Sequence, residues 1–227
     1  MLESVYNILG VVGVVLQLAL VALLVPSIRR YPVLFAYSVV YLATTTLEFL
    51  VVNTVGRDRS IYSTIYWTDE VLLDLLLFFV VISLVYQAAR ENPLAAVFHK
   101  MLMGVVAAAV ILPFVLLNPP YFKAHWFNGT SQMLNFGATL MNLALWTVLI
   151  GLRRKDPQLL LVSVGVGIAV TGASVSYGLR QFLARDLYWL PNLFLILTHV
   201  AGVAIWSWAF RPGAKTSTAR TGALSGA

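Results

Sequence analysis

Residues Tyr66–Tyr86 read YWTDEVLLDLLLFFVVISLVY, and they combine a long apolar run with three acidic residues. A membrane-spanning helix needs about 20 mostly apolar residues, so the stretch has the length of one span. Its acidic residues Asp69, Glu70 and Asp74 all lie in the first half, whereas Leu75 and the residues after it carry no charge. The stretch therefore predicts a transmembrane helix whose acidic groups are confined to one half of the membrane.

The composition of the whole chain points to the same environment. Hydrophobic residues make up 60% of the 227 residues and charged residues only 11%, whereas soluble proteins carry roughly 25% charged residues. A soluble protein this apolar would expose large apolar patches and aggregate. The composition thus excludes a soluble enzyme, a nucleic-acid-binding module and a disordered chain. The absence of cysteine excludes disulfides, iron–sulfur clusters and thiolate metal sites.

Seven apolar segments follow one another along the chain, which predicts an all-α membrane protein built as a bundle of seven transmembrane helices. The bundle is expected to occupy residues 1–210, and residues 211–227 are expected to form a disordered cytoplasmic tail, because they are rich in Gly, Ala, Ser and Thr. The expected spans are Ile8–Val25, Val33–Val52, Tyr66–Tyr86, Leu94–Leu117, Gln132–Leu152, Leu159–Phe182 and Leu190–Phe210.

The basic residues predict how this bundle is oriented. One set of loops, together with the C-terminal tail, holds ten of the 15 Lys and Arg residues, and the other set of loops holds five. Cytoplasmic loops carry the excess of Lys and Arg, so the N-terminus is predicted outside and the C-terminus in the cytoplasm. The net charge of +6 follows from the same bias. We expect an integral protein of a bacterial inner membrane.

The sequence also contains a weak internal repeat. Matching residues recur at an offset close to 125, which suggests two parallel three-helix units, residues 1–90 and 129–210, joined by a linker helix at 94–117. Substrate sites tend to lie at the interface of such repeats, near the middle of the membrane. The matches are Gln17–Leu20 with Asn142–Leu145, Arg29-Arg30 with Arg153-Arg154, Ser38 with Ser163, Thr46 with Thr171, and Tyr66-Trp67 with Tyr188-Trp189.

This three-plus-one-plus-three plan resembles that of the SWEET and PQ-loop transporters, and the chain shares the dipeptide Pro157-Gln158 with the latter. It also resembles the plan of the microbial rhodopsins. A retinal Schiff base needs a lysine within span seven, however, and none of the four lysines lies there, so a retinal protein is rejected. In its number of spans and its apolar composition, the chain further resembles small uncharacterised bacterial seven-helix membrane proteins. This resemblance implies nothing about its activity.

Polar residues inside the spans are the candidates for function. An ionisable residue at the centre of a span costs at least roughly 2.5–3.5 kcal/mol, so its presence indicates a functional site by default. Such groups gather in the outer halves of spans two, three, five, six and seven. The candidate ligand-binding or proton-binding residues are Glu48, Glu70, Asp74, Asn135, Asn142, Tyr177, Arg180, Asn192 and His199.

The spacing of these residues suggests how they act. Glu70 and Asp74 lie four residues apart on one helix face, and two like charges so close predict a shared proton. Asp69 is expected on another face, at the interface. Arg180 is expected either to pair with Glu48 or Glu70 or to extend to the membrane surface. The alternative for His199 is a core histidine bonded to a backbone carbonyl or hydroxyl.

Together these features predict a polar cavity that opens outward and is closed below by Leu75–Val81. We expect it to bind or transport a small, unknown solute, with proton coupling as an option. The alternative is a seven-helix sensor or receptor that signals through a partner protein. A lipid-modifying enzyme with a metal on Glu48, Glu70, Asp74 and His199 is less favoured, because no His-x-x-x-His or His-Glu-x-x-His spacing occurs. No metal or cofactor is predicted. The lipid bilayer is the expected partner, nucleic acid is not, and a homo-oligomer or a partner membrane protein stays open.

Overall fold

A computed structural model describes residues 2–54, 60–89, 103–104, 106–108, 111–112, 114–117, 124–151 and 156–212. All regular structure in these residues is helical, which confirms the predicted all-α class. The long helices in the described part are α1 (Leu2–Leu24), α2 (Pro32–Thr54), α3 (Ser60–Ala89), α5 (Ala124–Gly151), α6 (Pro157–Phe182) and α7 (Trp189–Phe210), joined in two places by the short 3-10 turns η1 (Val25–Ser27) and η2 (Arg185–Leu187).

Five of these helices are long and apolar enough to cross a membrane: Ser4–Ser27, Pro32–Thr54, Thr64–Ala88, Pro157–Phe182 and Trp189–Phe210. Helix α5 is 28 residues long and contains no Asp, Glu, Lys or Arg. The chain is therefore a membrane protein by the length and composition of its helices.

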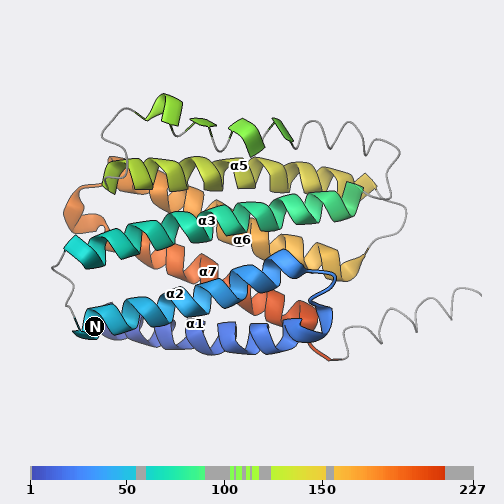
Figure 1. The fold of residues 1–227 in the computed structure, drawn as a ribbon, viewed down its shortest axis with the longest axis horizontal. Coiled ribbons are helices and arrows are strands. Elements are labelled where there is room, and N and C mark those ends of the chain that lie inside the picture. Colours follow the sequence, from blue (N-terminus) through green and yellow to red (C-terminus); the bar gives the residue numbers. More distant parts are fainter. Residues whose placement is uncertain are drawn as a thin grey trace, which may run out of the picture.

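The expected fourth span, Leu94–Leu117, lies mostly outside the described residues, as does the expected tail from residue 213 onward. Within that span, residues 103–104, 106–108, 111–112 and 114–116 are helical. Figure 1 shows these short pieces beside α5. The Phe114 ring, for example, lies 5.4 Å from the Trp126 ring, centroid to centroid. The predicted linker helix thus has described pieces next to α5, and its full course stays a prediction.

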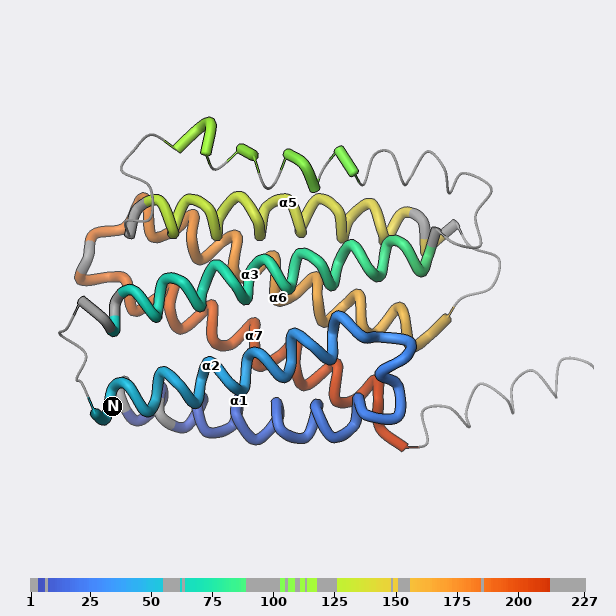
Figure 2. Tube along the Cα trace, viewed as in Figure 1, coloured from blue at the N-terminus to red at the C-terminus, as the bar shows by residue number. Residues whose placement is uncertain are grey.

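The long helices form a closed ring in the order α1, α2, α3, α5, α6, α7 and back to α1, with α3 also touching α6 across the ring. Figure 2 shows that α1, α3, α5 and α7 begin at one end of the bundle, where α2 and α6 finish. We call this the cavity end, and the opposite end, which holds Arg30 and Asp156, the clasp end. By the sequence prediction above, the cavity end faces outside.

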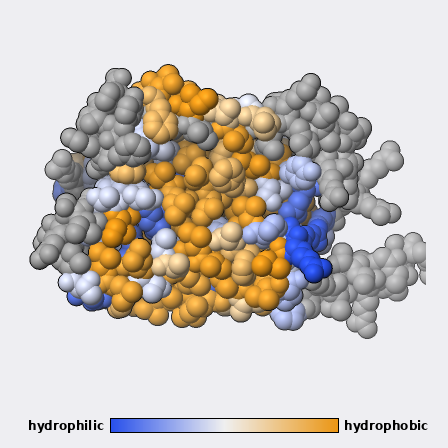
Figure 3. Space-filling model, viewed as in Figure 1, coloured by the Kyte–Doolittle hydropathy of each residue, from blue (hydrophilic) through white to orange (hydrophobic). Residues whose placement is uncertain are grey.

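The outer surface of the ring is apolar, as a bilayer requires. Large hydrophobic side chains such as Val11, Phe49, Leu143 and Ile150 are exposed on different helices. Figure 3 shows an apolar band along the bundle, with polar residues gathered toward the two ends of the described surface. Exposed apolar area of this extent is typical of a surface in contact with lipid.

Toward the clasp end the interior is tightly packed. Trp206 of α7 is fully buried, and its indole Nε1 donates a hydrogen bond to the Val162 carbonyl of α6, at 3.0 Å. A Cβ on Gly165 would lie 2.5 Å from that Nε1 and 2.9 Å from the Gly202 carbonyl oxygen, so the close approach of α6 and α7 requires glycine there. Small residues let membrane helices approach closely in this way.

Candidate functional site

A cavity of about 620 Å³ lies within the ring at the cavity end, between α1, α2, α3, α6 and α7. Figure 3 shows polar atoms recessed among apolar ones near that end. Along α3 the lining runs from Tyr66 to Leu77, about 16 Å at about 1.5 Å per residue, so the cavity reaches toward the middle of the bundle. Its polar lining residues are Tyr6, Tyr37, Tyr41, Thr45, Tyr66, Glu70, Asp74, Tyr177, Arg180, Asn192 and His199.

Most of the candidate residues from the sequence meet in this one cavity. The candidates that line it are Glu70, Asp74, Tyr177, Arg180, Asn192 and His199. Glu48, Asn135 and Asn142 do not line it. The residues that do come from α3, α6 and α7, and Leu73 and Leu77 of α3 supply apolar wall beside them.

The two α3 carboxylates share a hydrogen-bond donor. The Tyr177 hydroxyl, from α6, donates to Glu70 Oε1 and also lies 3.4 Å from Asp74 Oδ2. Ser131 and Asn135 of α5 lie beside the Asp74 carboxyl on its other side. Three helices therefore hold the pair, and only one hydroxyl proton is available from Tyr177 for two acceptors.

Arg180 does not form the expected ion pair with Glu48 or Glu70. Its Nε and Nη2 both donate to Asn192 Oδ1, at 3.1 and 2.8 Å, and its Cζ lies 5.1 Å from the centre of the Tyr177 ring. Among the described residues, the ion pair present is Arg30–Asp156, at the other end of the bundle. The prediction was wrong because α6 and α7 pack closely, which brings Asn192 within reach of the guanidinium.

Aromatic rings form the deeper wall of the cavity. Tyr41 of α2 stacks on His199 of α7 with ring centroids 4.5 Å apart and an interplanar angle of 17°. Tyr37, one turn deeper on α2, meets Trp206 edge to face at 5.9 Å. The ring nitrogens of His199 and the hydroxyl of Tyr37 have no hydrogen-bond partner within the described part of the chain, and both residues line the cavity.

Glu48 and Asp69 form an acidic extension beside the cavity. Glu48 is half-buried on α2 and interacts electrostatically with Asp69 and Glu70 of α3. Asp69 lies toward α2, with Thr44 beside its carboxyl group and Oδ1 buried. Asp69 is thus directed between two helices, although the sequence placed it at the membrane interface, because the α2–α3 contact covers that face.

The two asparagines of α5 are buried between helices, outside the cavity lining. Asn135 donates from Nδ2 to the Ser131 carbonyl, at 2.9 Å, and adjoins Asp74 from outside the cavity. Asn142 is buried against α6, where a Cβ on Gly167 would lie 2.5 Å from its Nδ2. Both face inward, as their spacing predicts, but α3 and α6 stand between them and the cavity lining.

The contribution of α1 to the cavity was not predicted from the sequence. Tyr6, Gly10 and Gly13 line the cavity, and the Tyr6 hydroxyl donates to the Trp189 carbonyl at 2.7 Å. Their spacing of four and three residues places them on one helix face, and that was the signal available. Glycines there leave room that larger side chains would fill.

No group of three His, Asp or Glu residues that could hold a metal ion occurs within the described ranges. Glu48, which the metal-enzyme alternative requires together with Glu70, Asp74 and His199, also lies outside the cavity lining. The arrangement instead offers paired carboxylates, a tyrosine donor and an aromatic wall. These groups can bind a solute and can hold or release a proton.

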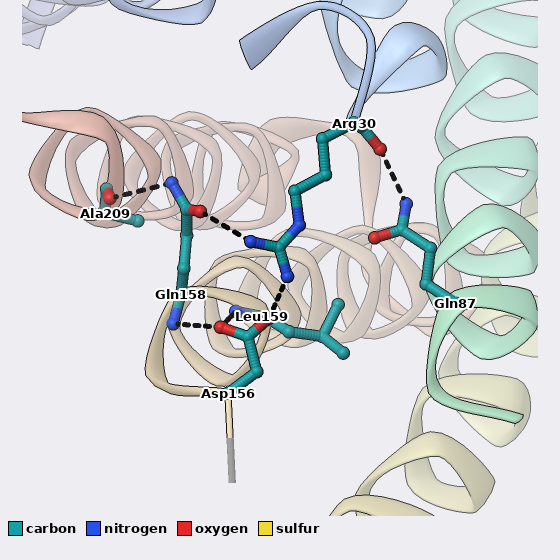
Figure 4. Close-up of polar contacts among 6 residues, drawn as sticks. All are labelled: Arg30, Gln87, Asp156, Gln158, Leu159 and Ala209. Carbon is teal, nitrogen blue, oxygen red and sulfur yellow. Dashed lines mark hydrogen bonds and ion pairs between the residues drawn. The ribbon is translucent and has the colours of Figure 1, made fainter. Parts of the chain in front are cut away.

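A second polar cluster closes the clasp end (Figure 4). The Arg30 guanidinium pairs with Asp156 and donates to Gln158 Oε1 at 3.3 Å, and the Arg30 carbonyl accepts from Gln87 Nε2 at 2.9 Å. Asp156 is also the N-cap of α6: its Oδ1 accepts from the backbone N–H groups of Gln158 and Leu159. The cluster ties the turn before α2 to α3 and α6.

We expect the cap of α6 to contribute more stability than the ion pair. Asp156→Ala removes both and should cost about 1–2 kcal/mol, since loss of an N-cap typically costs about 1 kcal/mol. Asp156→Asn keeps the cap and should cost about 0.5 kcal/mol, because the pair is 52% and 31% exposed. Equilibrium unfolding in mixed micelles measures both variants, and equal losses would contradict the dominance of the cap.

No family model matches the chain, and no curated protein and no solved structure is significantly similar to it. The resemblances in helix plan therefore stay predictions, and the function must be argued from the cavity itself.

Proposed function

We propose that this membrane protein binds a small solute in the cavity and carries it across the bilayer, with a proton exchanged at Glu70 and Asp74. The observation that carries the proposal is the convergence of Glu70, Asp74, Tyr177 and His199 on one cavity that reaches about half the length of a span. Ligand sites are concave, mostly apolar and equipped with a few convergent polar groups.

The carboxylate pair is the proposed proton site. Two carboxylates one helical turn apart, in surroundings of low polarity, repel each other, and one retained proton relieves the repulsion. The Tyr177 hydroxyl, which adjoins both groups, supports a proton shared across them. A solute that binds next to the pair changes the free energy of keeping that proton on the carboxylates. Solute binding is thereby coupled to proton uptake or release.

The proposed internal duplication supplies two three-helix units that move relative to each other during transport. Five pairs of residues at the offset of 125 are buried in both proposed units, which supports a similar role in each. The pairs are Gln17 and Asn142, Leu20 and Leu145, Leu24 and Leu149, Leu34 and Leu159, and Ser38 and Ser163. The ring order α1, α2, α3, α5, α6, α7 is also the order that a two-fold axis along the membrane normal would produce. We propose seven spans, an outside N-terminus and a bacterial inner membrane.

Proton movement in liposomes tests this function. The chain is reconstituted around a trapped pH indicator, and amino acids, sugars, amines and organic acids are added in turn. We expect at least one class to drive proton movement, and Asp74→Asn to reduce that movement at least about tenfold, since an amide cannot exchange the proton. The control is Asp186→Asn in η2, at an exposed position outside the cavity lining. Equal movement in the two variants would contradict the proton site.

The packed clasp end favours the alternative of a sensor. Trp206, Leu24 and Leu84 are buried beyond the cavity, so this conformation is closed on that side. A sensor would bind the solute in the same cavity and pass a change of shape to a partner protein. Solute binding without any flux in liposomes would favour the sensor over the transporter.

A further inference from the structure

We infer that the cavity takes a monovalent organic cation with an apolar body, such as an aromatic amine or a quaternary ammonium compound. The inference rests on the proposed function, because it names the solute class for the same cavity. Three features carry it: the charge of the wall, its aromatic rings, and the apolar volume next to them.

The two carboxylates in the cavity wall favour the binding of a cation. Neither Glu70 nor Asp74 has a basic side chain within ion-pair distance in the described part of the chain. Arg180, the basic residue that lines the cavity, has two of its donors on Asn192 and lies over the Tyr177 ring. A partly buried carboxylate without a cation beside it is costly, and a bound cation next to the pair would offset that cost.

Aromatic rings stand next to these carboxylates. Tyr41, stacked on His199, and Tyr66, one turn before Glu70, both line the cavity. A cation within about 6 Å of a tyrosine ring centre is attracted by the negative face of the ring. The Tyr37 hydroxyl, on a residue 2% exposed, also faces the cavity without a hydrogen-bond partner in the residues that the structure describes. Such a group is free to bind the solute.

The remaining wall sets the shape of the solute. Leu9, Leu73, Leu77, Leu195 and Ile196 line the cavity and would contact an apolar body. A sugar would leave its hydroxyl groups facing these side chains, and burial of unpaired hydroxyl groups is unfavourable. An organic anion would meet the two carboxylates. An amphipathic monovalent cation matches the charge, the rings and the apolar wall together.

Calorimetric titration tests the inference on the full chain in nanodiscs at pH 8, with empty nanodiscs as the reference. The probes are benzyltrimethylammonium, the uncharged phenylacetamide and the anion phenylacetate, which share the benzyl group. We expect the cation to bind at least about tenfold tighter than the other two. Glu70→Gln should weaken the binding of the cation about tenfold or more.

A matched pair at Tyr41 separates the ring from its hydroxyl. Tyr41→Leu should weaken the binding of benzyltrimethylammonium about 5- to 30-fold, whereas Tyr41→Phe should stay within about twofold, since phenylalanine keeps the ring face. Equal losses in the two variants would overturn the role of the ring. Both variants are compared with the unmodified chain for folding by size-exclusion chromatography.

The outcomes separate this inference from the proposed function. If phenylacetamide or phenylacetate binds as tightly as the cation, the inference of a cation is overturned and solute binding in the cavity stands. If none of the three binds, the inference is overturned as well, and the proposed function is then decided by the liposome assay. If no solute class drives proton movement there while the cation binds, proton-coupled transport fails and the inference holds.

Discussion

Replacing Trp206 with alanine is expected to lower the free energy of unfolding by about 3 kcal/mol, because large-to-small changes at fully buried aromatic positions cost about 3–5 kcal/mol. The indole is fully buried, donates to the Val162 carbonyl and meets the Tyr37 ring edge to face. Its removal leaves a hole beneath the cavity and deletes the hydrogen bond that joins α7 to the Val162 carbonyl of α6. The lower end of the range applies because the reference environment for an apolar side chain here is lipid.

Trp208→Ala is the matched control for this prediction. Trp208 lies two residues further along α7 and is 56% exposed, with the Arg211 guanidinium over its ring. We expect its replacement to cost less than about 1 kcal/mol. Equilibrium unfolding in mixed micelles measures both variants. If Trp206→Ala costs no more than Trp208→Ala, the packed floor of the cavity is contradicted.

Filling the cavity should have the largest effect on function. Ala173 of α6 lines the cavity, and a phenylalanine at that position would extend into its open volume. We expect Ala173→Phe to reduce the binding of benzyltrimethylammonium at least about 100-fold, because the ring would occupy space that the solute needs and displace it from Tyr41 and Glu70. The cavity offers about 620 Å³, so the fold should tolerate the added ring.

Val175→Phe tests whether the added ring acts through the cavity. Val175 lies on the same helix but is 43% exposed on the outer surface, where lipid accommodates a larger side chain. Its replacement should leave the binding of benzyltrimethylammonium within about twofold. Calorimetric titration in nanodiscs measures both variants, and full binding by Ala173→Phe would place the solute elsewhere.

Helix positions and shared faces could be predicted from the sequence. The apolar segments predicted the places of α1, α2, α3, α5, α6 and α7 in the chain, although α1, α3 and α5 begin before the predicted spans, at Leu2, Ser60 and Ala124. The four-residue spacing of Glu70 and Asp74 placed both carboxylates on one face. The polar residues of α6 and α7 were assigned to the same half of the membrane by their positions in the outer halves of the spans. These inferences depend on helix periodicity, which is local in the sequence.

Contacts between helices could not be predicted in this way. Spacing along one helix does not say which neighbour covers a face, so the sequence left Arg180 opposite a carboxylate, whereas the ring order places Asn192 there. The same limit hid the contribution of α1 to the cavity. At the clasp end, Arg30 was interpreted from the sequence as a loop charge and as part of the repeat, and its pairing with Asp156 was not predicted. Asp156-Pro157 is a typical N-cap followed by proline, and it marked the start of α6.

The proposed function depends most on a water-accessible cavity that opens to the outside at the cavity end. Because the chain contains no cysteine, Ala173→Cys and Val175→Cys each introduce a single thiol at nearly the same depth. In intact cells, a membrane-impermeant methanethiosulfonate reagent added from outside is predicted to label Ala173→Cys and to leave Val175→Cys unlabelled, because only the first faces the cavity. If Ala173→Cys is not labelled although the variant is shown to be folded in the membrane, the cavity and the function proposed for it are contradicted.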